Sequence, residues 1–333
     1  MDTPARFPLK RLPSLAIEEV ISTMLPFELY NFSKVSTACR LVVQSFSKNR
    51  THKHYLIHVS NMKHPTIDFE YNRVFWCWEM TNEIEKDGTQ VSENEYNRQY
   101  ETVYVYCGGE NLMKKCIEMF MYIKQVFNVG IDYLYIRLWE FKEQLQTILD
   151  WLLVNFPTIF YISVNCENEP VGLLEHTLNS LTNTKYVHIA GRTVENCAYS
   201  VPERFDKITI SDPDWIKVEH LMRFKASKIN ILHAKLTDAD LNAFLKSWIN
   251  MDGLRNLKDL ETTISSPDLQ NVLQDVPHRL CDPGKSPRRG SCFHQQGEGV
   301  EIDRKDGVVA SIFVYRVHDF YMMVMTTPLD ISL

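Results

Sequence analysis

Short apolar segments and helical patterns alternate between residues 131 and 264, and this alternation constrains the fold more than any other feature. Six segments rich in β-branched and aromatic residues begin 27, 27, 22, 21 and 29 residues apart, at 131–138, 158–165, 185–191, 207–212, 228–234 and 257–264. Their composition predicts strands. Helical patterns lie between most of them, at 141–156, 171–181, 214–224 and 237–249. The alternation predicts an α/β region with parallel strands.

Two architectures fit this alternation. A strand and a helix repeated every 20 to 29 residues is the interval of leucine-rich-repeat solenoids, although the fixed asparagine of those repeats is missing. A doubly wound sheet has the same order of elements. We favour a degenerate leucine-rich-repeat-like α/β solenoid over residues 111–276, because the interval stays near the repeat length and no glycine-rich phosphate loop is present.

Strands are also predicted on both sides of this region. Residues 52–110 contain strand-like segments at 55–62, 66–70, 74–80 and 102–107, and the polar piece 82–98 between them predicts a loop. We expect this part to be a small β-rich bridging segment. Residues 277–299 are rich in proline, glycine and polar residues and predict a disordered loop. Residues 300–327 predict C-terminal β-strands, with a hairpin turning at Asp306-Gly307 and a last strand at 320–325.

The first fifty residues are apolar but too few to bury a core of their own. Residues 7–48 contain three short helical patterns, with Ser14 suited to cap the first and Pro26 suited to end it and open the second. The overall class predicted is therefore α+β. A segment that cannot hide its own apolar faces predicts either half of an interface or a small helical cap packed on the rest of the chain.

The order of residues in this segment resembles an F-box. The pattern comprises Leu12-Pro13, an apolar helix from Ile17 to Met24, Pro26 with Leu29, Val35-Ser36 and Cys39-Arg40. The resemblance implies a trihelical element that docks on the Skp-type adaptor of a cullin ubiquitin ligase. Carried over residue by residue, it assigns most of the docking to Leu12, Pro13, Ile17, Val20, Ile21, Met24, Pro26 and Leu29.

A second resemblance covers residues 215–261. Leu236-Thr237-Asp238, Leu241-Asn242, Phe244-Leu245-Lys246 and Trp248 are similar to the type 2 F-box-associated domain of nematode F-box proteins, and Arg304, Asp306-Gly307 and Ala310 fit the end of that domain. Together the two resemblances imply a non-catalytic subunit that recognises a substrate. The partners implied are the adaptor, a cullin bound through it, and a protein substrate that the sequence does not name.

Composition agrees with this class of protein. The chain has 333 residues and a net charge of −6, so no basic field predicts nucleic-acid binding. No apolar run reaches the roughly 18 residues that a membrane span needs, and no signal peptide is recognisable at the start. The eight cysteines are scattered without zinc or redox spacing, as in reduced proteins of the cytoplasm or nucleus. We expect no metal and no cofactor.

Four tyrosines are candidate substrate-binding residues. Tyr133, Tyr135, Tyr161 and Tyr186 lie on successive predicted strands and alternate with leucine, isoleucine and valine. One alternating set of a strand points to the core and the other to the opposite face, where tyrosines give contact area at low entropic cost. They could equally be core or scattered surface residues. Two other functional classes remain open: an F-box scaffold acting outside ubiquitination, and an enzyme, although no catalytic motif is present.

Overall fold

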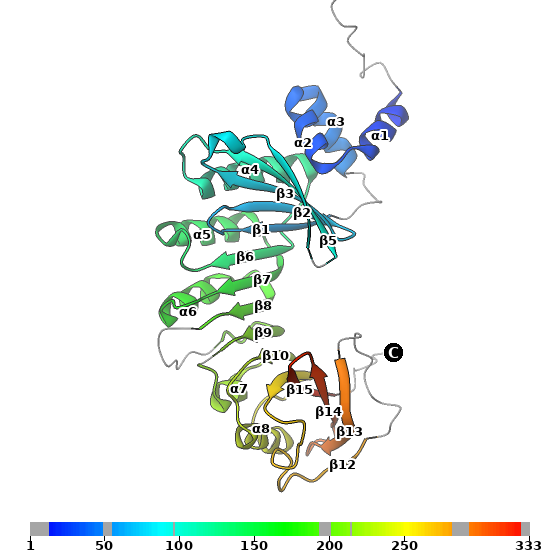
Figure 1. Cartoon of the computed structure of the whole chain (residues 1–333), viewed down its shortest axis with the longest axis vertical. Helices are drawn as coiled ribbons and strands as arrows, with labels where there is room; N and C mark the ends of the chain where they lie inside the picture. Colours follow the sequence, from blue (N-terminus) through cyan, green and yellow to red (C-terminus); the bar gives the residue numbers. More distant parts are fainter. Residues whose placement is uncertain are drawn as a thin grey trace, which may run out of the picture. The chain divides into compact units, whose positions relative to one another are not determined.

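The computed structural model describes residues 13–48, 55–95, 97–192, 201–213, 215–281 and 293–327 (Figure 1), with only the backbone of Phe293. They belong to two compact units, one ending at Leu134 and the other beginning at Tyr135. Three N-terminal helices precede mixed β-sheet with accompanying helices, so the predicted α+β class is confirmed.

The first three helices are α1 (Ser14–Thr23), α2 (Pro26–Val35) and α3 (Thr37–Lys48). The prediction that Ser14 caps α1 is wrong, because Pro13 occupies the cap position and Ser14 is already the first helical residue. Pro26 opens α2 as predicted, since its fixed φ suits the first turn. Glu28 then accepts a hydrogen bond of 2.8 Å from the backbone N–H of Leu25 and satisfies one of the free donors at the helix start.

The first unit also contains a sheet with the order β1-β2-β3-β5-β4. Its strands are β1 (Leu56–Ser60), β2 (Thr66–Tyr71), β3 (Val74–Thr81), β4 (Gln90–Glu95) and β5 (Arg98–Tyr106), and only β3 and β5 pair in parallel. Helix α4 (Leu112–Phe127) packs on this sheet, where the rings of Phe69 and Phe127 lie 5.3 Å apart. The predicted loop at 82–98 is wrong, because it contains the 3-10 turn η2 (Ile84–Lys86) and strand β4.

The second unit has the strand-and-helix alternation that the sequence predicts. Strand β6 (Tyr133–Arg137) begins at the end of the first unit, and β7 (Ile159–Asn165), β8 (Thr184–Ala190), β9 (Lys207–Ser211), β10 (Lys228–Leu232) and β11 (Asp259–Ile264) follow as neighbours in chain order. The connections contain η3 (Lys142–Gln144), α5 (Leu145–Asn155), α6 (Val171–Ser180), α7 (Val218–Arg223) and α8 (Asp238–Asn250). Figure 1 shows α5 and α6 along one side of the strands. Because the order never reverses between β6 and β11, the doubly wound alternative is wrong.

Aliphatic side chains stack in register from β7 to β11 and form the core of this unit. One row of paired positions consists of Ile162, Val187, Ile208, Ile229 and Leu260, all buried. The next row, two residues along each strand, consists of Val164, Ile189, Ile210, Ile231 and Thr262. The side-chain period of two therefore directs one face of every strand to the core and leaves the other face for function.

The end of the chain converts the parallel sheet into a mixed one. Strand β15 (Phe320–Thr326) pairs antiparallel with β11, β14 (Val309–Val317) pairs with β15, and β13 (Phe293–Asp303) pairs with β14. The predicted hairpin is confirmed, and Gly307 has a φ of +89° in its turn, where only glycine is unstrained. The predicted disordered loop 277–299 is wrong at both ends, which form β12 (Arg279–Leu280) and the start of β13. Residues 282–292 of that prediction lie outside the described residues.

Candidate functional site

Exposed apolar side chains concentrate on the three N-terminal helices. Of the eleven large apolar side chains that are exposed in the described ranges, five lie on α1 to α3 or in the two-residue connection between α1 and α2. We name them the exposed apolar set: Leu15 (74%), Val20 (40%), Leu25 (45%), Val35 (73%) and Leu41 (60%). Single exposed apolar residues are normal on protein surfaces, but five within twenty-seven residues make this segment a candidate interaction surface.

The structure separates the predicted docking residues into accessible and buried ones. Pro13 and Val20 are exposed, and Ile17 and Met24 are half-buried. Leu12 lies outside the described residues. The remaining three are buried, namely Ile21, Pro26 and Leu29. Adaptor docking by the eight residues stays a prediction. A buried side chain packs its own chain and cannot be touched by a partner while the helices stay in place. Leu15, Leu25, Val35 and Leu41 are exposed but are not among the predicted docking residues, since helical spacing alone does not say which apolar face is covered.

Helix α2 is fixed to the rest of the first unit through aromatic rings. Phe27 meets Trp78 of β3 edge-on at 4.8 Å between ring centroids, and Tyr30 lies 5.6 Å from the same indole. The ammonium of Lys34 lies 3.5 Å from the centroid of the Tyr122 ring on α4. The hydroxyl of Ser33 is 3.0 Å from that of Tyr122. The half of the segment that faces the chain is thus used for packing, while the exposed apolar set remains accessible.

The tyrosines of the second unit lie on the face opposite its aliphatic core. Tyr135, Tyr161 and Tyr186 are half-buried and alternate with buried neighbours such as Ile162 and Val187. The rings of Tyr135 and Tyr161 are 6.5 Å apart, and Tyr161 pairs in register with Tyr186. The alternation on which the prediction rests is therefore present, whereas substrate binding by these tyrosines remains a prediction.

Tyr133 lies in the first unit and has a different environment. Its ring stacks on the imidazole of His58 at 4.5 Å with an interplanar angle of 9°. His58 in turn contacts the Glu70 carboxylate at 2.9 Å, and burial is the main reason that the pKa of His58 is lowered. The structure therefore does not group Tyr133 with the other three tyrosines within one unit.

A histidine that sequence reasoning missed lies in the same face as Tyr161. His188 Nδ1 is 3.2 Å from the Ser163 hydroxyl, and its Nε2 is 2.9 Å from the Ser211 hydroxyl, so the three residues link β7, β8 and β9. Burial lowers the pKa of His188 and favours the neutral ring at pH 7. The sequence does contain a signal for this histidine: it lies between Val187 and Ile189, so the alternation places it on the face opposite the aliphatic core.

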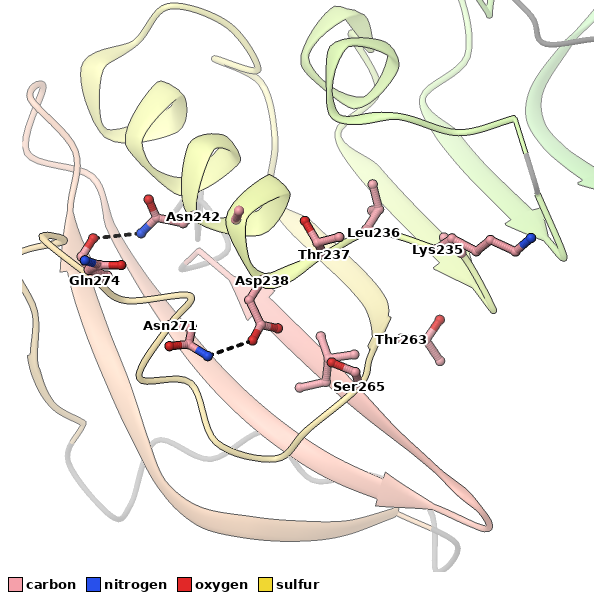
Figure 2. A pocket seen from close by; sticks show the side chains of 12 residues that line it. Lys235, Leu236, Thr237, Asp238, Asn242, Thr263, Ser265, Asn271 and Gln274 are labelled. Carbon is pink, nitrogen blue, oxygen red and sulfur yellow. Dashed lines mark hydrogen bonds between the residues drawn. The ribbon is translucent and has the colours of Figure 1, made fainter.

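A pocket of about 780 Å³ opens at the carboxyl ends of β10 and β11, next to the start of α8 (Figure 2). Asn271 donates a hydrogen bond of 3.2 Å to Asp238, and Asn242 donates to the carbonyls of Val272 and Gln274 at 2.8 Å each. These bonds hold the segment that follows β11 against α8. Thr237 caps α8 together with Asp240, as the sequence predicts. The polar residues of the pocket thus bind their own chain.

Within the described ranges, the structure contains no group of three histidine, cysteine or acidic residues arranged to hold a metal ion. None of the described helices is long and apolar enough to cross a membrane. Burial raises the pKa of the Cys77, Cys107 and Cys116 thiols, which keeps them protonated and poorly nucleophilic at neutral pH.

Comparison with known proteins agrees with both resemblances. Residues 9–51 match the F-box domain family, and residues 200–262 match the family described as F-box associated. The chain is an F-box protein with an F-box-associated domain. It is 24% identical over 335 aligned residues to the Skn-1 dependent zygotic transcript 15 protein of Caenorhabditis elegans. The alignment covers 92% of this chain and 93% of that protein. No solved structure matches. An F-box implies the part of a substrate adaptor in a Skp-cullin-F-box complex, whose F-box subunits are non-catalytic.

Several residues that resemble the F-box-associated domain stabilise the fold through contacts around helix α8. The guanidinium of Arg304 lies 5.0 Å from the Trp248 ring and binds both carboxylate oxygens of Asp306, at 2.8 and 2.9 Å. It also donates to the carbonyl of Arg255 at 2.9 Å. The turn between β13 and β14 is thereby attached to the end of α8. The Thr237–Asp240 cap and the Asn242 bonds fix the other end of the same helix.

Proposed function

We propose that this F-box protein is the substrate-recognition subunit of a Skp-cullin-F-box ubiquitin ligase. In this proposal the α1–α3 helices bind the Skp-type adaptor and the second unit binds a protein substrate. The chain would act by proximity, since holding a substrate near the ligase raises its local concentration without a reacting group of its own. This role would place it in the cytoplasm or nucleus.

The observation that supports the proposal most directly is the exposed apolar set. Each leucine or valine contributes about 1.5–3 kcal/mol when it moves from water into a well-packed interface. Five such side chains on one small helical element provide a sufficient driving force for docking. Pro13 and the half-buried Ile17 and Met24 supply further accessible surface from the predicted set, and Leu12 precedes them in the chain.

We infer that the second unit presents the substrate surface. The chain order of β6 to β11 supports a leucine-rich-repeat-like arrangement, in which the face opposite the helices is available to a partner. That face carries Tyr135, Tyr161, Tyr186 and His188. Tyrosine, serine and asparagine together give large contact area and adaptable hydrogen bonding, as in binding surfaces of antibodies. Tyr133, half-buried and stacked on the buried His58, remains a further candidate.

Docking can be tested with matched charge insertions. The variant Leu15→Asp/Leu41→Asp should lose co-purification with the adaptor and a cullin, because it places carboxylates in an apolar interface. Leu12→Ala/Pro13→Ala should lose it as well and leave the second unit folded. Val154→Asp is the control, since Val154 is 84% exposed but lies in the second unit. Wild-type yield of adaptor with both F-box variants would refute the proposal.

The substrate surface needs a separate test. Proteins captured while the ligase is inhibited should be identified by mass spectrometry for the wild type and for Tyr161→Ala/Tyr186→Ala. The variant should lose specific proteins and keep the adaptor, whereas Tyr106→Ala in β5 should change neither. Identical captured sets would refute the assignment of this face.

A scaffold outside ubiquitination is the alternative function. It predicts capture of the adaptor without a cullin, and half-lives of the captured proteins that do not depend on this chain.

A further inference from the structure

The negative charge of this protein is concentrated in one short segment. Residues 79–101 contain seven acidic and two basic residues, a net charge of −5, while the whole chain has a net charge of −6. The segment runs from the end of β3 through η2 and β4 into β5. All six residues of β4 are exposed. This charge lies in the first unit, and none of these residues is among those assigned to the adaptor or the substrate.

Strand β4 is also a free edge of its sheet. In the described part of the chain it pairs only with β5, and no strand pairs with its other side. The backbone N–H of Tyr104 donates to the carbonyl of Thr89 at 3.2 Å, and Tyr104 faces Thr89 one step beyond the Gln90–Val103 pair. Because hydrogen-bonded pairs alternate in an antiparallel ladder, the N–H and C=O groups of Gln90, Ser92 and Asn94 point away from β5. They are a ready-made template for another strand.

The side chains of β4 determine which kind of strand could pair with its free edge. Val91, Glu93 and Glu95 share one face of the strand, and Glu93 is opposite Tyr100 of β5. Burial raises the pKa of the nearby Glu79; the cations His64 and Lys86 lower it, and the charges of Glu83 and Glu93 raise it further. Val91 is 37% exposed and adds apolar surface to this face.

The cations near this edge do not cancel its charge. Lys86 is 2.8 Å from Glu83. Arg98 is the register partner of Glu95 across β4 and β5, and its guanidinium lies 5.5 Å from the ring of Phe75. Lys63 and His64 act on Glu83 from the β1–β2 connection. Glu93 and Glu95 are the charged side chains of β4 itself and are therefore nearest to an added strand, and the residue opposite Glu93 is Tyr100, which carries no positive charge. Two copies of β4 would repel one another, so the same charges that prevent self-pairing favour a strand of opposite charge.

We propose that the β4 edge binds a basic, extended segment of a partner protein by strand addition, with backbone bonds to Gln90, Ser92 and Asn94 and cationic side chains facing Glu93 and Glu95. Main-chain hydrogen bonds would supply a large part of the affinity and the charge pairs the preference. None of its residues belongs to the F-box helices or to the tyrosine face of the second unit.

The test uses the full chain and two labelled decapeptides, one alternating lysine and threonine and one alternating glutamate and threonine. Fluorescence anisotropy should detect binding of the lysine peptide only, with affinity falling about tenfold when ionic strength rises to about 1 M, where charges are screened within roughly 3 Å. Glu93→Lys/Glu95→Lys should exchange the preference for the two peptides. Ser92→Pro removes an outward N–H and should weaken binding about tenfold, whereas Ser92→Ala should bind as the wild type does.

A second measurement changes the peptide and leaves the protein intact. Lysine peptides methylated on the backbone nitrogen of every lysine, or of every threonine, should differ strongly in affinity, because only alternate N–H groups of an added strand face β4. Equal affinity of these two peptides, equal affinity of the lysine and glutamate peptides, or no binding by the wild type would each overturn the proposal. Leu12→Ala/Pro13→Ala should bind the lysine peptide normally, which separates this surface from adaptor docking.

Discussion

The phenyl ring of Phe27 meets the indole of Trp78 edge-on, at 4.8 Å between centroids and 88° between planes. Phe27 belongs to the second F-box helix and Trp78 to the sheet of the first unit, and both side chains are buried. An F-box joined to its sheet by aromatic packing does not move as a tethered peptide would. The F-box helix α2 therefore has a fixed orientation within the first unit.

Replacement of Phe27 by alanine should destabilise the first unit by about 3–5 kcal/mol, the usual cost of removing a buried phenyl ring. Hydrogen exchange of the α2 amides under native conditions measures this loss locally. The control is Val35→Ala on the same helix, because Val35 is 73% exposed and should change protection little. Equal protection in the two variants would contradict the packing described for Phe27.

Asp68 gives the first unit a pH dependence of defined sign. Burial raises the pKa of its carboxyl to about 6 from an ordinary 3.8, and its Oδ1 has no hydrogen-bond partner among the described residues. The folded state then holds the proton more tightly than the unfolded state. The stabilisation that comes from protonated Asp68 is fully present below the unfolded-state pKa of about 3.8, and it is lost as pH rises through the folded-state pKa of about 6.

The variant Asp68→Asn should therefore stabilise the first unit at pH 7.5 by on the order of 2 kcal/mol and have little effect at pH 4. Urea unfolding at several pH values, followed by tryptophan fluorescence, measures the difference. Glu83→Gln is the control, since Glu83 is solvent-exposed and its removal should not reproduce this profile. A carbon NMR titration of Asp68 with a midpoint near 4 would contradict the prediction.

Arg304 should be essential for attachment of the C-terminal strands. Alanine at this position removes the Trp248 contact, both Asp306 bonds and the bond to the Arg255 carbonyl, and we expect a loss of roughly 2–3 kcal/mol. Hydrogen exchange in β13 and β14 measures it. Arg304→Lys should recover only part of the stability that Arg304→Ala loses, because an ammonium cannot make the two parallel bonds to a carboxylate. Full rescue by lysine would show that charge alone matters there.

Gly191 should not tolerate a side chain. Its φ is +92°, and an added Cβ would lie 2.9 Å from the backbone nitrogen of Glu167. We expect Gly191→Ala to lower the stability of the second unit by at least about 2 kcal/mol. Gly172→Ala is the matched control, since nothing lies within 4 Å of its Cβ and it sits in α6, where alanine gains about 0.5–1 kcal/mol over glycine. Thermal unfolding should move in opposite directions for the two variants.

The regular strands of this fold are predictable from the sequence, and β4 shows why one is not. Strands such as β7 and β8 carry an apolar residue at every second position, because one of their faces is buried. Strand β4 reads Gln-Val-Ser-Glu-Asn-Glu and buries nothing. It forms through its backbone bonds to β5 and needs no hydrophobic period. A polar edge strand therefore has the composition of a loop.

The candidate sites were only partly predictable for a related reason. Helical spacing identifies Ile21 and Leu29 as apolar-face residues as well as it identifies Leu15 and Leu41. Which of them is covered depends on how the three helices pack against one another and on α4 and β3, which are distant in sequence. His188 was not singled out, because its serine neighbours come from strands more than twenty residues away.

The pairing of β11 with β15 has a consequence for synthesis on the ribosome. Each strand from β7 to β11 can pair with the one made just before it, so this part of the sheet can grow as the chain emerges. Strand β11 ends at Ile264, but the strand that covers its other side begins only at Phe320. During the intervening translation, β11 presents an uncovered edge to the surroundings. A nascent chain stalled within those residues would be a preferred client for chaperones.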